Sequence, residues 1–331
     1  MELTWLDPDR PDARALAGAV AVLEAARAVD APHELGPTVT SFTARHRNGW
    51  DGDPPVTAVA WDQRGRAIGV LEIWLGRWDN LHLGAIDVTV DPVVRRQGIG
   101  RQLFEAGVQR VVDAGRRVVL AGSRDLPAAL AFAKEMGLDR AYEEVHRRQD
   151  VRTLDWARPD REYAAAQPKA SGYEFLRISG AAPEDMIEDV ALMTAAINDA
   201  PTDDLDMEDE VFTPERIRVF DAAQQARNRR MYRLVARERA TGVLAGHTVV
   251  GVEGERPWHA WQYDTSVVRA HRGHRLGLLL KVGMLRWLAE EEPQLRTLDT
   301  ENAASNAHMI GVNELLGYYV IGKTIGWQRH L

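Results

Sequence analysis

The sequence VTVDPVVRRQGIGR, residues 88–101, carries the strongest structural signal in this chain. It begins as an alternating β-rich run, turns at Pro92, and passes two arginines and two glycines before an amphipathic helix opens. A strand, a tight turn and a helix in this order aim free backbone N–H groups and the positive end of the helix dipole at one point. Because phosphate groups bind readily at such a junction, we expect an anion here.

The glycines and arginines of this turn also favour the binding of an anion. Gly98 and Gly100 let an anion approach the backbone without a Cβ in the way, and Arg95, Arg96 and Arg101 add positive charge. The spacing is neither that of a Walker A loop nor that of the G-x-G-x-x-G dinucleotide fingerprint. A tight turn whose arginines are simply solvated is the alternative interpretation.

The order Val-x-Pro-x-x-Arg-x-x-Gly-x-Gly resembles the coenzyme A signature of the GCN5-related N-acetyltransferases, whose core is Arg/Gln-x-x-Gly-x-Gly/Ala. Arg95, Gly98 and Gly100 occupy that core. The resemblance implies that acetyl-CoA is the acetyl donor and that this loop holds its pyrophosphate. The cofactor-binding residues that it implies in the first half of the chain are Val88, Val90, Arg95, Arg96, Gln97, Gly98, Ile99, Gly100 and Arg101.

Composition limits the class of protein. The chain has 331 residues, enough for two ordinary domains, and 45% of them are hydrophobic. A net charge of −8 argues against nucleic acid as a partner and suits a cationic substrate, although mild acidity is also common in proteins of the cytosol. The chain has no cysteine, which excludes disulfides, thiolate catalysis and cysteine metal sites, and we expect no metal cofactor.

Membrane and export signals are not expected. No apolar run reaches the ~20 residues of a membrane-spanning helix, and the first residues lack the basic and apolar regions of a signal peptide. We therefore expect a cytoplasmic protein that acts without a membrane partner, as a monomer or a homodimer.

The order of expected elements predicts two α/β units with mixed sheets. A shift of 177 residues carries Asp87 to Asp264, Arg95 to Arg272 and Gly100 to Gly277, and it also aligns Gly69 with Gly246 and Leu103 with Leu280. We therefore expect two tandem copies, residues 1–150 and 173–331. Residues 151–172 lack periodicity and are expected to be a linker, with a packed connection across the first domain as the alternative.

The resemblance therefore extends over nearly the whole chain, as two N-acetyltransferase domains in tandem. This architecture is similar to that of the actinobacterial tandem type, which includes mycothiol synthase. In the second copy Arg275 stands where Gly98 stands in the first, so that a Cβ is added to the phosphate loop. The cofactor-binding residues implied for this copy are Val267, Arg272, Gly273, His274, Arg275, Gly277 and Asn306, the last of which has helix capping as its alternative role.

Acetyl transfer to an amine needs a base, and Asp264 and Glu301 are the candidates for the base or the amine-binding group. In the family the general acid is often a Tyr four residues before the Gly of the last helix. Ala133 and Asn313 fall at that position here, so Tyr318 is the nearest replacement, with core packing as its alternative role.

An acceptor pocket is expected in the second copy. The acidic segment 198–210, with Asp203 and Asp204, falls where the family places a loop that covers the substrate, although a charge run is usually just solvated. Trp261 and Tyr263 on a nearby strand are candidates to line the pocket.

The leading functional hypothesis is an N-acetyltransferase that moves an acetyl group from acetyl-CoA directly to a primary amine of a small molecule. A non-catalytic acyl-CoA-binding regulatory protein is one alternative, motivated by the missing Tyr in both copies. A peptide or protein N-acetyltransferase is the other, and it would need an open groove.

Overall fold

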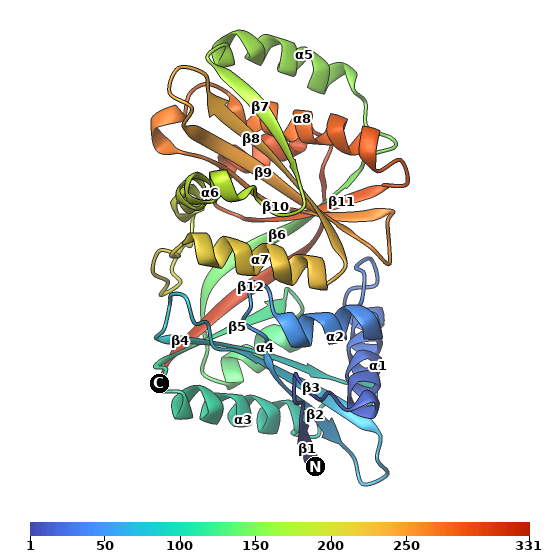
Figure 1. Cartoon of the computed structure of the whole chain (residues 1–331). Coiled ribbons are helices and arrows are strands. Elements are labelled where there is room, and N and C mark those ends of the chain that lie inside the picture. Colours follow the sequence, from blue (N-terminus) through green and yellow to red (C-terminus); the bar gives the residue numbers. More distant parts are fainter. The chain divides into compact units, whose positions relative to one another are not determined.

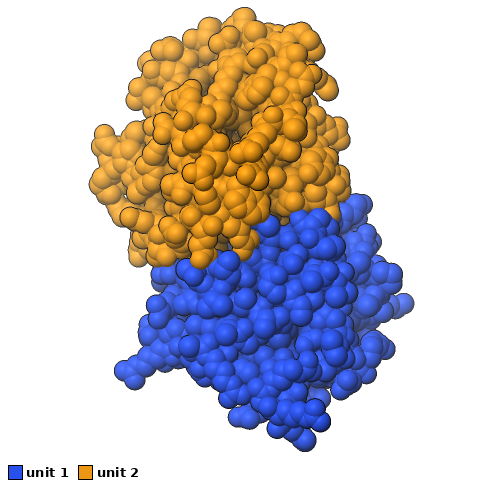
Figure 2. All heavy atoms as spheres, turned by 90° about the vertical axis from the view of Figure 1, so that its right-hand side faces the viewer, with its two compact units in different colours: residues 1–143, 202–209, 322–331 blue, residues 144–201, 210–321 orange.

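The computed structural model describes all 331 residues, and these form two compact units. Unit 1 consists of Met1–Glu143, Thr202–Asp209 and Gly322–Leu331, and unit 2 consists of Glu144–Pro201 and Glu210–Ile321 (Figure 2). Each unit therefore contains segments that are far apart in the sequence.

Unit 1 is built on a mixed sheet with the strand order β1-β2-β3-β4-β5-β12. Its strands are β1 (Glu2–Trp5), β2 (Val56–Trp61), β3 (Ala67–Trp74), β4 (Leu83–Val90), β5 (Val118–Arg124) and β12 (Tyr319–His330). Only the β4–β5 pair is parallel. The sheet is buried on both faces, since residues that alternate along β2 and β3 enter two different apolar clusters.

Helices cover both faces of this sheet. They are α1 (Ala13–Asp30), α2 (Val39–Asn48), α3 (Ile99–Asp113) and α4 (Pro127–Glu135), with a short 3-10 turn, η1 (Pro92–Val94), before α3. Leu16 of α1 and Phe42 of α2 pack against Val59 and Val70 of the sheet. Leu103 of α3 is fully buried on the opposite face, where α4 also packs.

Unit 2 repeats this plan with the strand order β6-β11-β10-β9-β8-β7. Its strands are β6 (Asp139–Asp150), β7 (Tyr173–Ser179), β8 (Arg229–Glu238), β9 (Leu244–Glu253), β10 (His259–Val267) and β11 (Thr297–Ala303). Here the β10–β11 pair is the parallel one, and the other pairs are antiparallel. The expected mixed α/β fold with two tandem copies is thus confirmed.

The helices of unit 2 also lie on two faces (Figure 1). They are α5 (Ala157–Ala166), α6 (Ile187–Thr194), α7 (Pro214–Ala226), α8 (Leu276–Glu291) and α9 (Ala307–Leu315), with 3-10 turns η2 (Gln167–Ala170), η3 (Glu184–Met186), η4 (Ala195–Asp199) and η5 (Arg269–His271). The apolar residues of α6 and α7 pack on one face of the sheet, and those of α8 pack on the other.

The last strand of each unit comes from the other half of the sequence. Residues 144–150 of β6, which follow α4 of unit 1, pair with β11 of unit 2. Residues 324–330 of β12, which follow α9 of unit 2, pair with β5 of unit 1. The division at residue 150 that the repeat suggested therefore differs from the one in the structure, because hydrophobic periodicity identifies a strand without showing which sheet edge it pairs with.

The segment 151–172 is structured and packed. It contains α5 and η2, and Ala166 and Ala170 are buried in the core of unit 2 beside residues of α8. Tyr163 of α5 lies under the Arg286 guanidinium of α8, whose carbon is 4.1 Å from the ring centroid. The connection is thus packed, as the alternative interpretation had it, but onto the second unit.

Candidate active site

The junction between β4 and α3 in unit 1 is a turn with two residues in the left-handed region. Arg96 has φ of 64° and Gly98 has φ of 82°. The helix starts at Ile99 without a side chain that caps its first N–H groups. A Cβ at Gly98 would meet only the Gln102 amide nitrogen, at 3.9 Å. The turn therefore leaves the first N–H groups of α3 without a side-chain cap, and such free donors suit an anion.

The corresponding junction between β10 and α8 in unit 2 has the same backbone conformation. Gly273 has φ of 86° and Arg275 has φ of 61°. Helix α8 begins at Leu276, again without a side-chain cap. The first of the two left-handed positions is Arg96 in unit 1 and Gly273 in unit 2, and the second is Gly98 in unit 1 and Arg275 in unit 2. The arginine and the glycine are thus exchanged, but both loops turn at equivalent positions. Arg275 therefore leaves the path of the loop unchanged.

The first arginine of each loop holds the loop to its own unit. In unit 1 the Arg95 Nε donates to the Val90 carbonyl at 3.2 Å, and its two terminal nitrogens reach the Asp30 carboxylate at 2.9 and 2.5 Å. In unit 2 the Arg272 Nε donates to the Val267 carbonyl at 3.0 Å, and Nη2 reaches Asp199 at 2.5 Å. Both guanidinium groups thus fix the turn and point their charge at an aspartate.

The other polar loop residues differ between the units. Arg96 and Gln97 of unit 1 are exposed, whereas Arg101 pairs with Glu105 and Glu135 on the surface. In unit 2 the His274 Nδ1 lies 2.9 Å from the Lys169 carbonyl.

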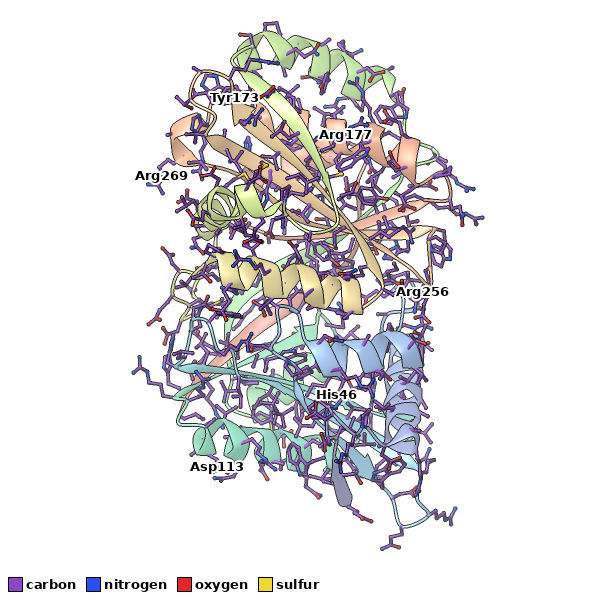
Figure 3. The ribbon with its side chains drawn as sticks, viewed as in Figure 1. His46, Asp113, Tyr173, Arg177, Arg256 and Arg269 are labelled. Carbon is purple, nitrogen blue, oxygen red and sulfur yellow. The ribbon has the colours of Figure 1, made fainter.

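Further contacts fix the unit 2 loop. Arg275 pairs with Glu162 at 3.3 Å, and Arg269 and Arg272 share Asp199. Figure 3 labels Arg269 and also Tyr173, which contacts the same loop. The hydroxyl of Tyr173 lies 3.0 Å from His271 Nδ1. The loop of unit 2 is thus the more heavily fixed of the two.

The apolar members of the expected cofactor set shape the loop from behind. Ile99 is buried in the unit 1 core, and Val88 and Val90 pack against the same cluster. Val267 packs against the equivalent core of unit 2. A Cβ at Gly100 would lie 3.3 Å from the Phe132 ring of α4, whereas one at Gly277 would meet no neighbouring atom within 4 Å. Gly100 therefore permits close packing of α3 and α4.

The two central strands of each sheet part beside the loop. In unit 1, residues 83–86 of β4 pair with residues 118–121 of β5. Beyond these pairs, β5 is bonded only to β12. In unit 2, residues 259–261 of β10 pair with residues 297–299 of β11. Beyond these pairs, β11 is bonded only to β6. We call each of these openings a splay. Asp87 follows the last paired residue of β4, and Asp264 and Glu301 lie beyond the last pair in unit 2.

Only the splay of unit 2 has a β-bulge beside it. The β9–β10 register shifts between Gln262 and Thr265, so Tyr263 and Asp264 form the irregularity. The β3–β4 register runs without a shift from Gly69–Val90 to Trp74–Ala85. Because a bulge leaves one residue out of the ladder, it frees a backbone donor at this position of β10.

Asp264 is half-buried at the bulge. Burial raises the pKa of its carboxyl, and Arg233 and Arg216 partly oppose that rise. Arg233 is itself buried, with Nη2 3.7 Å from Asp221 Oδ1, and burial lowers its pKa. A carboxylate with a raised pKa is a stronger proton acceptor than an ordinary aspartate, which suits a general base.

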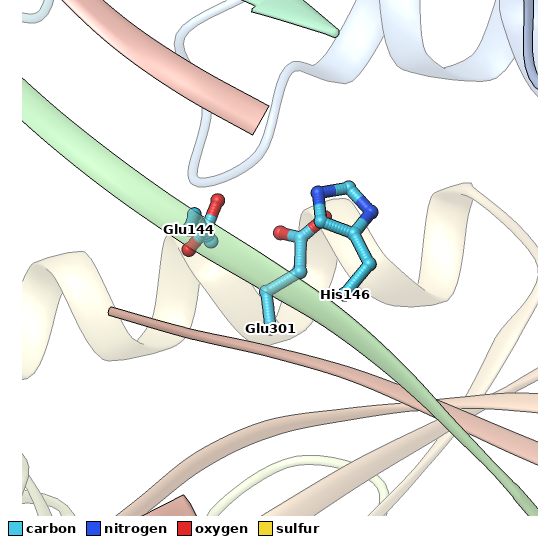
Figure 4. A group of neighbouring side chains, drawn as sticks. All are labelled: Glu144, His146 and Glu301. Atoms are coloured by element: carbon cyan, nitrogen blue, oxygen red, sulfur yellow. The ribbon is translucent and has the colours of Figure 1, made fainter. Parts of the chain in front are cut away.

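Glu301 lies on β11 next to His146 of β6. Glu301 Oε1 is 2.8 Å from His146 Nε2, and Glu144 lies on the same side of β6 (Figure 4). Neither His146 nor Glu144 was expected at this site, because the repeat in the sequence assigns β6 to the first domain. A histidine two residues after a glutamate in a strand was the available signal, and it is informative only once β6 is placed beside β11.

Unit 1 has a simpler acidic site at its splay. Asp87 is accessible to solvent, but the surrounding protein raises its pKa to about 6, and the nearby Glu72 carboxylate adds to the rise. Glu72 lies opposite Asp87 on β3, is buried, and binds Arg45 at 2.7 Å.

Tyr318, the expected replacement for the general acid, lies in the core of unit 2. Its side chain is buried, its hydroxyl has no hydrogen-bond partner, and its ring centroid lies 5.1 Å from Lys281 Nζ. Burial raises its pKa, and the Asp299 carboxylate adds to the rise. An enclosed hydroxyl of this kind does not fit the role of general acid and agrees with the alternative of core packing.

Asn306 and the acidic segment also make contacts other than those expected from the sequence. The Asn306 side chain caps α9 by accepting from the Met309 N–H at 3.1 Å, which is the capping alternative. Asp203 and Asp204 belong to unit 1, where the Asp204 N–H donates to the Ala141 carbonyl at 3.0 Å. Residues 202–209 of the acidic segment are therefore part of unit 1, and not of the second copy to which the sequence assigned them.

The two aromatic candidates remain on the unit 2 sheet beside the bulge. Trp261 and Tyr263 are both half-buried on β10. The Tyr263 hydroxyl accepts from Arg229 Nη1 at 2.6 Å, and burial raises its pKa. Both lie on the same strand as Asp264, so they remain candidates for lining an acceptor site.

Comparison with known proteins agrees with this geometry. The family model for the Acetyltransferase (GNAT) family matches residues 24–138. No curated protein matches the chain. None of the helices is long and apolar enough to cross a membrane.

Solved structures match the chain along its length. A tandem GNAT protein from the clavulanic acid biosynthesis pathway, solved without AcCoA, is 25% identical with a TM-score of 0.79, over 99% of this chain and 98% of that one. A GCN5-related N-acetyltransferase from Sphaerobacter thermophilus is 14% identical with a TM-score of 0.69, over 99% and 95% of the two chains. The family model in the first copy and the end-to-end match to a tandem GNAT protein support a tandem member of the GNAT superfamily, and with it an acyltransferase.

Proposed function

We propose that this protein transfers the acetyl group of acetyl-CoA directly to a primary amine of a small molecule, at the splay of unit 2. The observation that carries the proposal is the placement of Asp264 and Glu301 beyond the last β10–β11 pair, on the strands beside the α8 loop. Two carboxyl groups there give the opening a negative charge that suits an ammonium ion.

The loops fit the coenzyme. Each helix that follows a loop begins without a side-chain cap, so its first N–H groups are available to the pyrophosphate. When bound, acetyl-CoA supplies an activated acetyl thioester. Arg96 and Gln97 in unit 1, and Gly273 and His274 in unit 2, are the loop residues that we expect to contact the phosphates, while Arg95 and Arg272 hold the loops in shape.

The two carboxyl groups take different roles in this proposal. Glu301, held by His146, binds the ammonium group of the acceptor. Asp264, whose pKa burial raises, accepts the proton that the ammonium must lose before it can attack. A backbone N–H freed at the Tyr263–Asp264 bulge stabilises the negative charge that develops on the thioester oxygen. As the C–N bond forms the C–S bond breaks, and the leaving thiolate takes up the second proton that the acetylated nitrogen releases.

Direct transfer and a small acceptor have separate support. The chain has no cysteine, so an acyl-cysteine intermediate is excluded. The structure that matches the chain end to end at 25% identity comes from the biosynthesis of a small molecule, clavulanic acid. That relationship favours a small-molecule amine over a peptide or protein as the acceptor.

A second candidate function, a non-catalytic acyl-CoA-binding protein, is favoured by one observation. Tyr318, the replacement for the missing general acid, is enclosed in the core. The coenzyme loops serve both functions equally well, so the two differ only in turnover.

The test is thiol release from acetyl-CoA with polyamines, aminoglycosides, amino sugars and short peptides as acceptors. We expect turnover with at least one small amine, and a much lower rate in Glu301→Gln, which keeps the shape of the side chain but loses its charge. Tight coenzyme binding without turnover on any amine would favour the binding protein instead. Turnover on peptides alone would favour the protein N-acetyltransferase.

A further inference from the structure

Three side chains on two neighbouring strands of unit 2 form a compact group with metal-ligand chemistry. Glu144 and His146 are two residues apart on β6 and so lie on one face of the sheet, and Glu301 lies opposite His146 on β11. One ligand atom from each lies within 4.8 Å of the other two (Figure 4). The exchange of β6 into unit 2 is what brings the three together.

The three side chains differ in burial. His146 is buried, and Glu144 and Glu301 are half-buried. The next cross-strand pair on the same face is Arg148 with Asp299, joined by two hydrogen bonds of 2.7 Å. That pair anchors β6 against β11 directly beside the histidine, so the backbone positions of His146 and Glu301 are well defined.

We propose that Glu144, His146 and Glu301 bind one divalent transition-metal ion. An imidazole nitrogen with two carboxylate oxygens is a mixed donor set of the kind that Zn²⁺ and its first-row neighbours accept. Three protein ligands leave further coordination positions for water or for a polar group of a substrate. The two carboxylates balance the charge of the ion.

The geometry requires only small movements of side chains. With metal–ligand bonds of ~2.0–2.2 Å and tetrahedral angles, neighbouring ligand atoms lie roughly 3.4 Å apart. His146 Nε2 and Glu301 Oε1 are 2.8 Å apart, and the largest separation in the group is below 4.8 Å. Rotation about the glutamate side-chain bonds covers the difference, and the imidazole nitrogen exchanges its contact with Glu301 for the ion.

This proposal goes beyond acetyl transfer and is tested without it. The protein is freed of metal with a chelator, the chelator is removed, and Zn²⁺ is titrated by calorimetry. Co²⁺ is titrated in parallel, because its visible absorption reports on the ligands. We expect one ion per chain, and a Co²⁺ spectrum that contains a nitrogen ligand.

Variants locate the ion. His146→Gln and Glu144→Gln should each weaken the affinity at least tenfold, because loss of a direct ligand should cost no less than the ~10–100-fold that loss of a supporting group costs. His308→Asn is the matched control, since His308 is exposed on α9 and outside the group. Circular dichroism and thermal melting confirm that each variant is folded.

Three results would overturn the proposal. The first is the absence of stoichiometric binding of both Zn²⁺ and Co²⁺. The second is an affinity that His146→Gln leaves unchanged in a folded protein. The third is a loss of affinity in His308→Asn as large as that in His146→Gln. None of these results depends on turnover, so a failure of the metal site is distinguishable from a failure of acetyl transfer. A bound ion would occupy Glu301 and would therefore compete with the ammonium group that we propose for the same carboxylate.

Discussion

At the scale of single residues, the titration of Asp264 is the sharpest test of the proposed chemistry. A base acts only when it is deprotonated, so kcat/KM should rise with pH through the raised pKa of Asp264. Asp264→Asn should lower kcat/KM by about 100-fold above that pKa, since general bases typically contribute ~10²–10⁴-fold. It should also remove the acidic limb of the pH profile. A loss of equal size at every pH would mean that Asp264 only positions the substrate.

Lys281 gives a prediction about stability. It is buried on α8, and burial lowers its pKa from 10.5 to about 7. Between pH 7 and 10.5 the unfolded chain therefore binds more protons at this site than the folded chain. The free energy of unfolding should rise with pH across that window.

Lys281→Met should remove this dependence and stabilise the protein at pH 7 and below. The gain should be up to a few kcal/mol, because one pKa unit corresponds to ~1.4 kcal/mol. Urea unfolding at pH 6.5 and pH 9 measures it, with exposed Lys134→Met as the control. The same stability in Lys281→Met and wild type at pH 6.5 would refute the burial of a charged amine.

At the scale of elements, the sequence predicts the turns before α3 and α8 but not the contacts that their arginines make. The turn and the helix start follow from Pro92 and the glycines, which are local signals. The bonds from Arg95 to Asp30 and from Arg272 to Asp199 join residues more than sixty positions apart. No spacing rule reveals such pairs, so both arginines were assigned to the phosphate and not to the loop itself.

The loop of unit 1 is tested by Gly98→Asp. The added carboxylate would face the pyrophosphate, so binding at this loop should be lost. Gly98→Asn is the control, because it strains the same left-handed backbone, at φ of 82°, without adding charge.

Calorimetric titration with acetyl-CoA should give two sites per chain in wild type and one in Gly98→Asp. In Gly98→Asn the second site should persist with weakened affinity. Two undiminished sites in Gly98→Asp would contradict the role of this loop. A single site in wild type would show that the copies have diverged.

At the scale of the whole molecule, the repeat was visible in the sequence but its strand exchange was not. A register of 177 residues shows that there are two copies, yet β6 and β12 would fit either sheet edge equally well by their alternation. The candidate site was affected by the same ambiguity. The sequence suggests Asp264 and Glu301 as candidates, whereas His146 and Glu144 became candidates only when β6 was placed beside β11.

The exchange predicts that unit 1 depends on the C-terminal end of the chain. Ile325 and Trp327 of β12 are buried in the unit 1 core, and each side chain contributes ~1.5–3 kcal/mol by burial. A chain that ends at Ile321 should lose this contribution and leave the edge of β5 unpaired, which invites aggregation. Hydrogen exchange of the β5 amides measures the loss: those bonded to β12 should lose their protection in the shortened chain. A synthetic peptide of residues 319–331 should restore it. Unchanged protection along Val118–Arg124 in the shortened chain would show that β12 does not hold this edge.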